Sequence, residues 1–367
     1  MDFSNWKTGY RHYDGADKKI SLINNGVHYI VKFPNEIQEK GSLNSSYSNN
    51  VVSEYISCRI IKETGLPVQD VMLGTYHGVP AVACRDFSEP SFKLHEFSKF
   101  QNSYLGGSKI GRTPRFEDLT EIMHKHSMLQ GRQDIIDRYW DIFVIDGFLG
   151  NFDRHAGNWG YLVNEDTGEL KNAPVYDCAS CLYPQISDTG IERIIQSRDE
   201  INKRIFDFPK AALSINDKKV SYHELIGNTD FPECGRALCR MMPVINKIDY
   251  NKIVDDTEGI SDIRKSFYKT MLKERKEQLL DKAYEKAKSE YLEGTKKYQI
   301  SCTDQGVSDK MMKEFVREDI DYIMAREDGT DTFIFSADQL QKAILIRDTM
   351  IKEYNKDQIR EHNKDDR

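Results

Sequence analysis

Short apolar runs alternate with turn residues near the N-terminus, a pattern typical of paired strands. The runs Ile20–Ile23 and Val27–Val31 flank Asn24-Asn25-Gly26, and Asn and Gly tolerate the positive φ angles of tight hairpin turns. Two further runs, 71–76 and 79–84, are joined by a His-Gly pair. The pattern therefore predicts two β-hairpins in a small sheet.

One helix is predicted between these hairpins. Apolar residues recur at helical spacing from Val51 to Ile61, which is typical of a helix with one buried face. Gly65 ends the run, and Pro67 prevents the helix from resuming. We expect this helix to lie across one face of the sheet.

From about Pro90 the spacing becomes mostly helical. Segments 116–129 and 135–149 both read as helices, and the second is apolar on most of its sides, which predicts a helix buried inside a larger unit. Further elements are expected along the rest of the chain: a hairpin at 159–163 and 170–176, helices near 190–205, 262–289 and 337–354, and a short strand at 332–335.

Length and charge limit the class of protein. A chain of 367 residues suffices for two or three packed units, because one core seldom exceeds roughly 250–300 residues. We expect units at 1–88, 89–292 and 293–367. Lys and Arg number 52 against 59 Asp and Glu, and the resulting net charge of −7 argues against direct nucleic-acid binding. The sequence shows neither a signal peptide nor an apolar run of membrane-spanning length, so we expect no membrane attachment.

Seven cysteines, an odd number, are spread thinly along the chain, which favours a reducing cytoplasm over a disulfide scaffold. The pairs Cys178/Cys181 and Cys234/Cys239 allow a four-thiolate zinc site to be drawn. Packing as small buried side chains is the favoured interpretation, because each pair sits in an otherwise ordinary stretch.

The candidate chemistry begins just after the buried helix. Asp153 and Asn158 lie in the loop 150–158, and Asp177 ends the strand pattern that follows. Two carboxylates and an amide oxygen that converge can hold Mg²⁺ against nucleotide phosphates, while one carboxylate orients an attacking hydroxyl. His155, in the same loop, is expected to brace it by hydrogen bonding. An Asp- and Asn-rich turn that merely closes a helix is the alternative.

Two charged residues upstream favour the chemical interpretation. Lys32 ends a hairpin strand, and Glu54 lies on the predicted helix. A strand lysine held by a helix glutamate is how kinases direct an ammonium group to the α- and β-phosphates. Each residue alone could be a solvated surface charge, but their order before the Asp, Asn and Asp set makes coincidence a poor explanation.

Taken together, the sequence resembles the HipA-like kinases, which are bacterial serine/threonine kinases and often the toxin of a toxin–antitoxin pair. Five segments carry the resemblance in order: Gly15–Ile20, Ile30–Pro34, Ser53–Tyr55, Gly150–Asn158 and Ala173–Asp177. The resemblance implies an α+β, bilobal protein-kinase-like fold, with a small β-rich N-lobe, a larger helical C-lobe and, here, an α-rich C-terminal extension. It also implies ATP, Mg²⁺, a protein substrate with Ser or Thr and, as for the toxin members, an antitoxin partner.

Roles follow from the resemblance residue by residue. It implies that Asp153 is the catalytic base, that Asn158 and Asp177 bind Mg²⁺, and that Lys32 pairs with the phosphates while Glu54 holds it. The loop 14–19 is expected to cover the phosphates, and its binding residues are Gly15, Ala16, Asp17, Lys18 and Lys19.

The adenine is expected at a hinge between the two lobes. Backbone N–H and C=O groups of the segment 82–86 would read its edge, with Val82 and Cys84 close by and Asp86 contacting the ribose. This expectation rests on topology and not on a motif.

Three features depart from the family pattern. One is the segment after residue 293, for which the family offers no counterpart. Only about ten residues precede the phosphate loop, so the chain resembles a short form without an extra N-terminal domain. Self-inactivating members phosphorylate a serine in this loop, whereas residues 11–19 contain neither Ser nor Thr.

Three alternatives stay open. The Asp-Arg-His-x-x-Asn pattern of residues 153–158 also occurs in phosphatidylinositol-type lipid kinases, although those need a basic membrane-facing surface. A non-catalytic binding protein with the kinase fold would normally lack the lysine, the base or the metal-binding acid. A metallohydrolase that uses His155 with Asp153 is the third.

Overall fold

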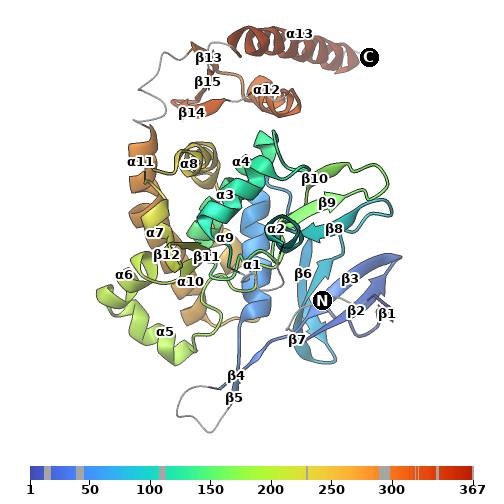
Figure 1. The fold of residues 1–367 in the computed structure, drawn as a ribbon. Coiled ribbons are helices and arrows are strands. Elements are labelled where there is room, and N and C mark those ends of the chain that lie inside the picture. Colours follow the sequence, from blue (N-terminus) through green and yellow to red (C-terminus); the bar gives the residue numbers. More distant parts are fainter. Residues whose placement is uncertain are drawn as a thin grey trace.

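Three apolar cores organise the part of the chain that the structure describes. Figure 1 shows the arrangement of its helices and strands. The computed structural model describes residues 1–11, 18–38, 45–106, 113–228, 230–288, 298–318, 320, 322–335 and 339–365. A small core lies under the N-terminal sheet, the largest fills the helical part, and a third lies within residues 300–350. None of the helices that are described combines the length and apolar character needed to cross a membrane.

The N-terminal part is an antiparallel sheet of five strands in the order β1-β2-β3-β7-β6. Both predicted hairpins are confirmed: Asn25 and Gly26 join one pair at positive φ, and His77 and Gly78 join the other. The strands are β1 (Lys7–Thr8), β2 (Lys19–Asn24), β3 (Val27–Lys32), β6 (Val71–Tyr76) and β7 (Val79–Arg85), and a short pair, β4 (Glu36–Gln38) and β5 (Ser45–Tyr47), lies outside the sheet.

The predicted helix between the hairpins is α1 (Asn50–Glu63), and it packs against β6 and β7. Its face toward the sheet is buried, as the helical spacing of its apolar residues requires. Val82 and Cys84 of β7 join the same core as α1, whereas Ala81 and Ala83 face the core of the N-terminal sheet. The alternation of side chains along β7 therefore links the two cores.

The helical part surrounds α4 (Gln133–Leu149), which is buried along most of its length, as its apolar sequence predicts. Gly150 ends α4 in the left-handed region, at φ 68°, and turns the chain into the loop that holds Asp153. The other elements of this part are β8 (Lys93–Glu96), α2 (Phe97–Leu105), α3 (Phe116–Lys125), β9 (Gly160–Val163), β10 (Leu170–Asn172), α5 (Asp188–Ile195), α6 (Arg198–Phe206), β11 (Lys210–Ile215), β12 (Lys218–Ser221), α7 (Tyr222–Leu225), α8 (Pro232–Ile245), α9 (Tyr250–Asp255), α10 (Asp262–Arg275), the π-helical turn η1 (Lys276–Asp281) and α11 (Lys282–Lys288).

The C-terminal segment is a small α+β unit. Its predicted helical character is confirmed by α12 (Gln305–Arg317) and α13 (Leu340–Asp365), but a three-stranded sheet, β13-β15-β14, accompanies them. The strands β13 (Tyr298–Cys302), β14 (Ile323–Glu327) and β15 (Thr330–Phe335) are antiparallel. Phe333 and Phe335 bury against Met311 and Phe315 of α12, so the segment has its own core and is more than a solvated appendage.

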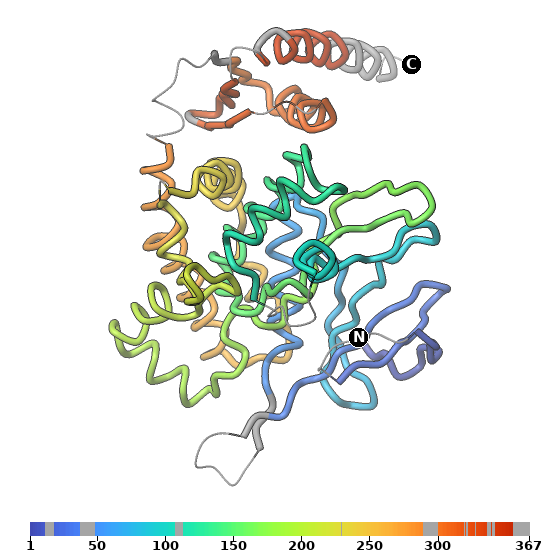
Figure 2. Tube along the Cα trace, viewed as in Figure 1, coloured from blue at the N-terminus to red at the C-terminus, as the bar shows by residue number. Residues whose placement is uncertain are grey.

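In the chain trace of Figure 2 this segment lies beyond the helical part, next to α8, which β14 contacts. We propose the units 1–88, 89–292 and 293–367 as the working division of the chain. The C-terminal core is separate, whereas the core of the helical part extends onto α1 and the inner face of β7, so the first two units share their packing.

Gly160 tests the packing of β9 against β8. A Cβ atom at this position would lie 2.2 Å from the carbonyl oxygen of His95 and 2.7 Å from the Cα of Glu96, both backbone atoms of β8. We expect Gly160→Ala to lower the free energy of unfolding by about 1–3 kcal/mol, the usual cost of overpacking. Denaturant unfolding measures it. As a control, Asp166→Ala in the exposed turn between β9 and β10 should change the free energy of unfolding by no more than about 0.5 kcal/mol. Equal effects of the two substitutions would contradict the close packing of β9 on β8.

Candidate active site

A buried ion pair joins three segments that are distant in the sequence. Lys32 lies at the end of β3, and its Nζ is 3.0 Å from Oε2 of Glu54 on α1 and 3.0 Å from Oδ1 of Asp177. Lys32 is 8 % exposed and Glu54 is fully buried. Burial lowers the pKa of Lys32, but the two carboxylates outweigh it and hold that pKa well above its usual value. Lys32 is therefore a fixed cation.

Glu54 is the buried anion of this pair. Burial raises the pKa of Glu54 to about 7, although the Lys32 ammonium acts in the opposite direction. Its Oε1 accepts a hydrogen bond from the backbone N–H of Cys178 at 3.2 Å. The helix carboxylate thus contacts both the strand lysine and the segment that follows Asp177.

The loop after α4 presents Asp153 to solvent. Its carboxylate is about half exposed, while its backbone is fixed on both sides. The backbone N–H of Asp153 donates to Oδ1 of Asn151 at 3.0 Å, and the side-chain Nδ2 of Asn158 donates to the carbonyl of Asp153 at 2.8 Å. Tyr222 O–H donates to the carbonyl of Asn151 at 2.6 Å and anchors the loop to α7. The result is a fixed carboxylate that a substrate can reach.

The oxygen donors of the site lie near this carboxylate. Since Nδ2 of Asn158 is used within the loop, its Oδ1 is the atom left for a cation. Asp177 has φ 57°, in the left-handed region that Asp tolerates better than most residues. Burial raises the pKa of Asp177, yet the Lys32 ammonium outweighs it and lowers that pKa. The pKa of Asp153 is raised, mainly by burial and also by the nearby charge of Asp177.

Arg154 holds the two loops together through a partner, Asp146, that the sequence did not identify. Arg154 forms a two-pronged ion pair with Asp146 of α4, with Nε at 2.8 Å and Nη2 at 3.1 Å. Its Nη1 also donates to the carbonyls of Asn158, at 2.8 Å, and Tyr176. Both charged side chains are buried. Asp146 is the only charged residue in the apolar stretch 142–149, and this was the available signal for it.

His155 contacts the loop as expected of a brace. Its Nδ1 accepts a hydrogen bond from the backbone N–H of Gly157 at 3.0 Å, so Nε2 carries the proton when the ring is neutral. That Nε2 lies 4.0 Å from Oδ1 of Asp153. The imidazole thus faces the carboxylate from within the same loop.

The expected phosphate loop is described only at its end. Gly15, Ala16 and Asp17 lie outside the described residues. Lys18 is exposed, with its Nζ 5.7 Å from the ring centre of Phe33. Lys19 opens β2 opposite Lys32, and its charge contributes to the lowered pKa of Asp177.

The expected adenine contacts need one correction. β7 is an inner strand, and residues 82–85 pair with β3 on one side while 82–84 pair with β6 on the other. Their backbone groups are thus used by the sheet, and the prediction that they read the adenine is wrong. The side chains of Val82 and Cys84 are buried against α1, and Asp86 pairs with Arg11. The contact of Asp86 with a ribose stays a prediction.

The arrangement suits phosphate chemistry. One ammonium group (Lys32), three carboxylates (Glu54, Asp153 and Asp177) and one amide oxygen (Asn158) come from four segments and lie where the N-terminal sheet joins the helical part. The oxygen donors match the ligand preference of Mg²⁺, and the ammonium group suits a phosphate oxygen.

Comparisons with known proteins agree with this geometry. Residues 12–258 match the HipA-like C-terminal domain family. The chain is 37% identical over 284 residues to the serine/threonine-protein kinase CtkA of Helicobacter pylori, covering 77% of this chain and 86% of that protein. The crystal structure of the H. pylori proinflammatory kinase CtkA matches with a TM-score of 0.73 at 36% identity, over 78% of this chain and 97% of that one.

A weaker structural similarity, with a TM-score of 0.44 and 17% identity, is found to a chain of the Shewanella oneidensis HipA, HipB and operator DNA complex, over 75% of this chain and 67% of that one. The family match and the CtkA similarity each span about two thirds or more of the chain. This chain therefore belongs to the HipA-like C-terminal domain family and is a serine/threonine protein kinase with the bilobal kinase fold.

Proposed function

We propose that this kinase transfers the γ-phosphoryl group of ATP to a Ser or Thr hydroxyl of a protein, at the site formed by Lys32, Asp153 and Asp177. The observation that carries the proposal is the buried contact of Lys32 with both Glu54 and Asp177. This contact brings the ammonium group of Lys32 and the carboxylate of Asp177 to one point, near the accessible carboxylate of Asp153, which supports the proposal.

Asn158 and Asp177 are the residues that would hold Mg²⁺. The fit rests on Oδ1 of Asn158, left over by the hydrogen bond of Nδ2, and on Asp177, whose lowered pKa keeps it ionised. When bound, Mg²⁺ would neutralise charge on the β- and γ-phosphates. Lys32 would then share its ammonium group between Glu54 and a phosphate oxygen.

Asp153 would act on the acceptor hydroxyl. As the hydroxyl oxygen forms its bond to the γ-phosphorus, the bond from that phosphorus to the β,γ-bridging oxygen breaks, and the hydroxyl proton moves to the Asp153 carboxylate. The raised pKa of Asp153 makes this carboxylate a better proton acceptor than an ordinary aspartate. ADP leaves with the electron pair of the broken bond.

The Arg154–Asp146 pair would position the reacting groups. Through one guanidinium it connects α4 with the carbonyls of Asn158 and Tyr176, which lie in or beside the metal-binding segments. Neither side chain needs to contact the nucleotide. We therefore assign both residues a positioning role.

The lipid-kinase alternative is disfavoured by charge. The net charge of −7 offers little attraction to an anionic membrane surface. Transfer from labelled ATP to a protein mixture and to phosphoinositide vesicles, measured in parallel, separates the two substrate classes. We expect label in protein, and label in lipid alone would overturn the protein-kinase proposal.

Replacing the base should remove transfer and leave the fold intact. For Asp153→Asn we expect the rate of phosphate transfer from labelled ATP to fall by a factor of about 10² to 10³, the span typical of a positioned base. Because the side chain is half exposed, the melting temperature should stay close to that of the wild type. Asp166→Asn, in an exposed turn, is the matched control and should retain activity. Equal rates for Asp153→Asn and wild type would exclude Asp153 as the base.

Acid should weaken nucleotide binding through Glu54. Since its pKa is raised to about 7, the carboxylate takes up a proton as the pH falls through that value and no longer holds Lys32 by charge. We expect the KM for ATP to rise between about pH 8 and pH 6. Glu54→Gln is neutral at every pH, so it should show a high KM without this dependence. The same slope in both proteins would contradict the assignment to Glu54.

Removing the partner of Arg154 should be costly. Asp146→Asn leaves a guanidinium buried without a counter-charge, which typically costs about 3–5 kcal/mol. Denaturant unfolding measures the loss. Asp134→Asn, in the first turn of the same helix, removes an exposed partner of Arg132 and should cost about 0–1 kcal/mol. Comparable losses for the two would show that the buried pair has no special weight.

A further inference from the structure

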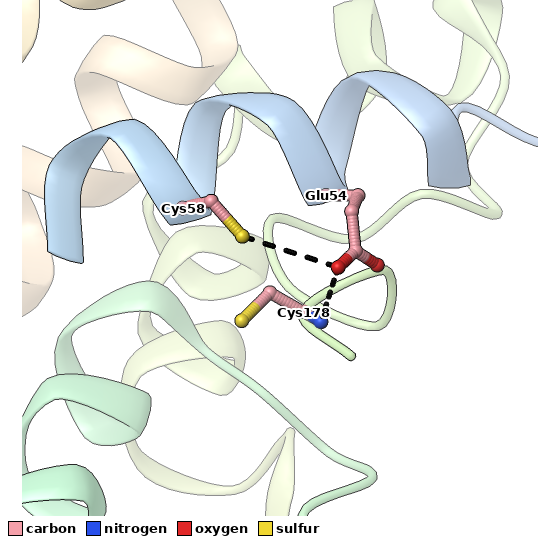
Figure 3. A group of neighbouring side chains, drawn as sticks. All are labelled: Glu54, Cys58 and Cys178. Atoms are coloured by element: carbon pink, nitrogen blue, oxygen red, sulfur yellow. Dashed lines mark hydrogen bonds between the residues drawn. The ribbon is translucent and has the colours of Figure 1, made fainter. Parts of the chain in front are cut away.

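Two thiols lie directly behind the catalytic ion pair. Cys58 follows Glu54 by one turn of α1, and Cys178 follows Asp177 in the chain (Figure 3). One ligand atom from each of Glu54, Cys58 and Cys178 lies within 4.8 Å of the others. All three residues are buried, with exposures of 0 %, 2 % and 0 %. These three side chains form what we call the thiol cluster.

The carboxylate of Glu54 is divided between two duties. Its Oε2 accepts a hydrogen bond from Nζ of Lys32 at 3.0 Å, whereas its Oε1 faces the two cysteines. On that side it contacts the Sγ of Cys58 at 3.9 Å and the backbone N–H of Cys178 at 3.2 Å, as the dashed lines of Figure 3 show. A change in charge or position at the thiols therefore acts directly on the Glu54 carboxylate that holds Lys32.

The ligand types in the thiol cluster differ from those of the magnesium site. Thiolate sulfur favours soft or borderline cations such as Zn²⁺, whereas Mg²⁺ takes oxygen ligands. Zinc binds thiolate at about 2.3 Å and carboxylate oxygen at about 2.0–2.2 Å, so ligand atoms some 3–4 Å apart suit it. The three atoms need only small shifts to reach that spacing.

This set is not the one suggested by cysteine spacing. In the described part of the chain, Cys234 and Cys239 on α8 belong to no such group. Cys178 lies with Cys58 and Glu54, and its thiol also contacts that of Cys181. The guanidinium of Arg154 lies 3.4 Å from the Sγ of Cys178. It supplies positive charge beside a site that would carry one net negative charge with two thiolates, one carboxylate and one divalent cation.

We propose that Glu54, Cys58 and Cys178 form an inhibitory site for a thiophilic divalent cation of the zinc class. The cation replaces the two thiol protons, which leave to solvent, and takes Oε1 of Glu54 as its third ligand. The site itself stands on the geometry of the thiol cluster, while its inhibitory effect rests on the proposed role of Lys32 and Glu54.

Inhibition follows from two physical effects. A cation on Oε1 withdraws negative charge from the carboxylate and repels the Lys32 ammonium on Oε2, so the pair that positions Lys32 weakens. The same cation draws Cys178 toward Cys58 and shifts its neighbour Asp177 in the chain. Added Mg²⁺ does not relieve this inhibition, because Mg²⁺ competes poorly for sulfur.

Binding can be tested without any kinase assay. The full chain, reduced and free of metal, is incubated with Co²⁺, whose thiolate complexes absorb in the near ultraviolet, and Zn²⁺ uptake is measured by equilibrium dialysis. We expect one cobalt-thiolate chromophore per chain, lost on addition of Zn²⁺. Cys58→Ala should lose the chromophore and bind Zn²⁺ at least about tenfold more weakly. Cys234→Ala, which removes a buried thiol of α8, is the matched control and should keep both.

The outcomes are separable. If wild type shows no chromophore, or if Cys58→Ala keeps it, the thiol cluster is only a packing contact and the proposal falls. If the cation binds as expected but leaves phosphate transfer by wild type unchanged, the inhibitory role falls and the site remains. Should Cys58→Ala fail to fold, the wild-type spectrum together with Cys178→Ser decides, because serine keeps the volume and removes the sulfur.

Discussion

The ammonium group of Lys32 is the charge on which the arrangement of the site depends. It is the common partner of the helix carboxylate of Glu54 and of the loop carboxylate of Asp177, which lies 123 residues after Glu54 in the chain. A carboxylate as deeply buried as Glu54 is stable in ionised form only with such a partner. The sheet, α1 and the segment at Asp177 must therefore come together for all three charges to be paired.

A second buried ion pair, in the helical part, also joins segments that are separate in the chain. Arg154 and Asp146 compensate each other in a region that is otherwise apolar, and the remaining N–H groups of the guanidinium bind backbone carbonyls. The guanidinium thereby ties the loop of Asp153 and Asn158 to the segment that ends in Asp177. Well-packed apolar residues often serve stability as well as such a pair does, but they would not fix these carbonyls. We interpret the pair as a device for geometry more than for stability.

The thiol cluster gives the site a feature that phosphate transfer by itself does not require. The sulfur atoms of Cys58 and Cys178 lie within 4.8 Å of the Glu54 carboxylate that holds Lys32. Thiols at these positions would couple the Lys32–Glu54 pair to the presence of a thiophilic cation, and this coupling is the basis of the proposed inhibitory site.

The amino-acid sequence by itself determined the local elements and indicated the candidate reacting groups. The hairpins follow from Asn25-Gly26 and His77-Gly78, because few residues adopt positive φ, and α4 follows from its apolar run. Lys32, Glu54, Asp153, Asn158 and Asp177 stood out because their types and order are those of phosphoryl transfer. Their assigned roles stay proposals, although the structure places Lys32, Glu54 and Asp177 in direct contact.

Only the tertiary structure decided which side chains share a partner. The engagement of the β7 backbone on both sides, the pairing of Arg154 with Asp146, the sheet of the C-terminal segment and the meeting of Cys58 with Cys178 all depend on contacts between distant segments. Spacing along the chain reports neighbours within one helix or strand, and it carries no information about what another element brings to the same point.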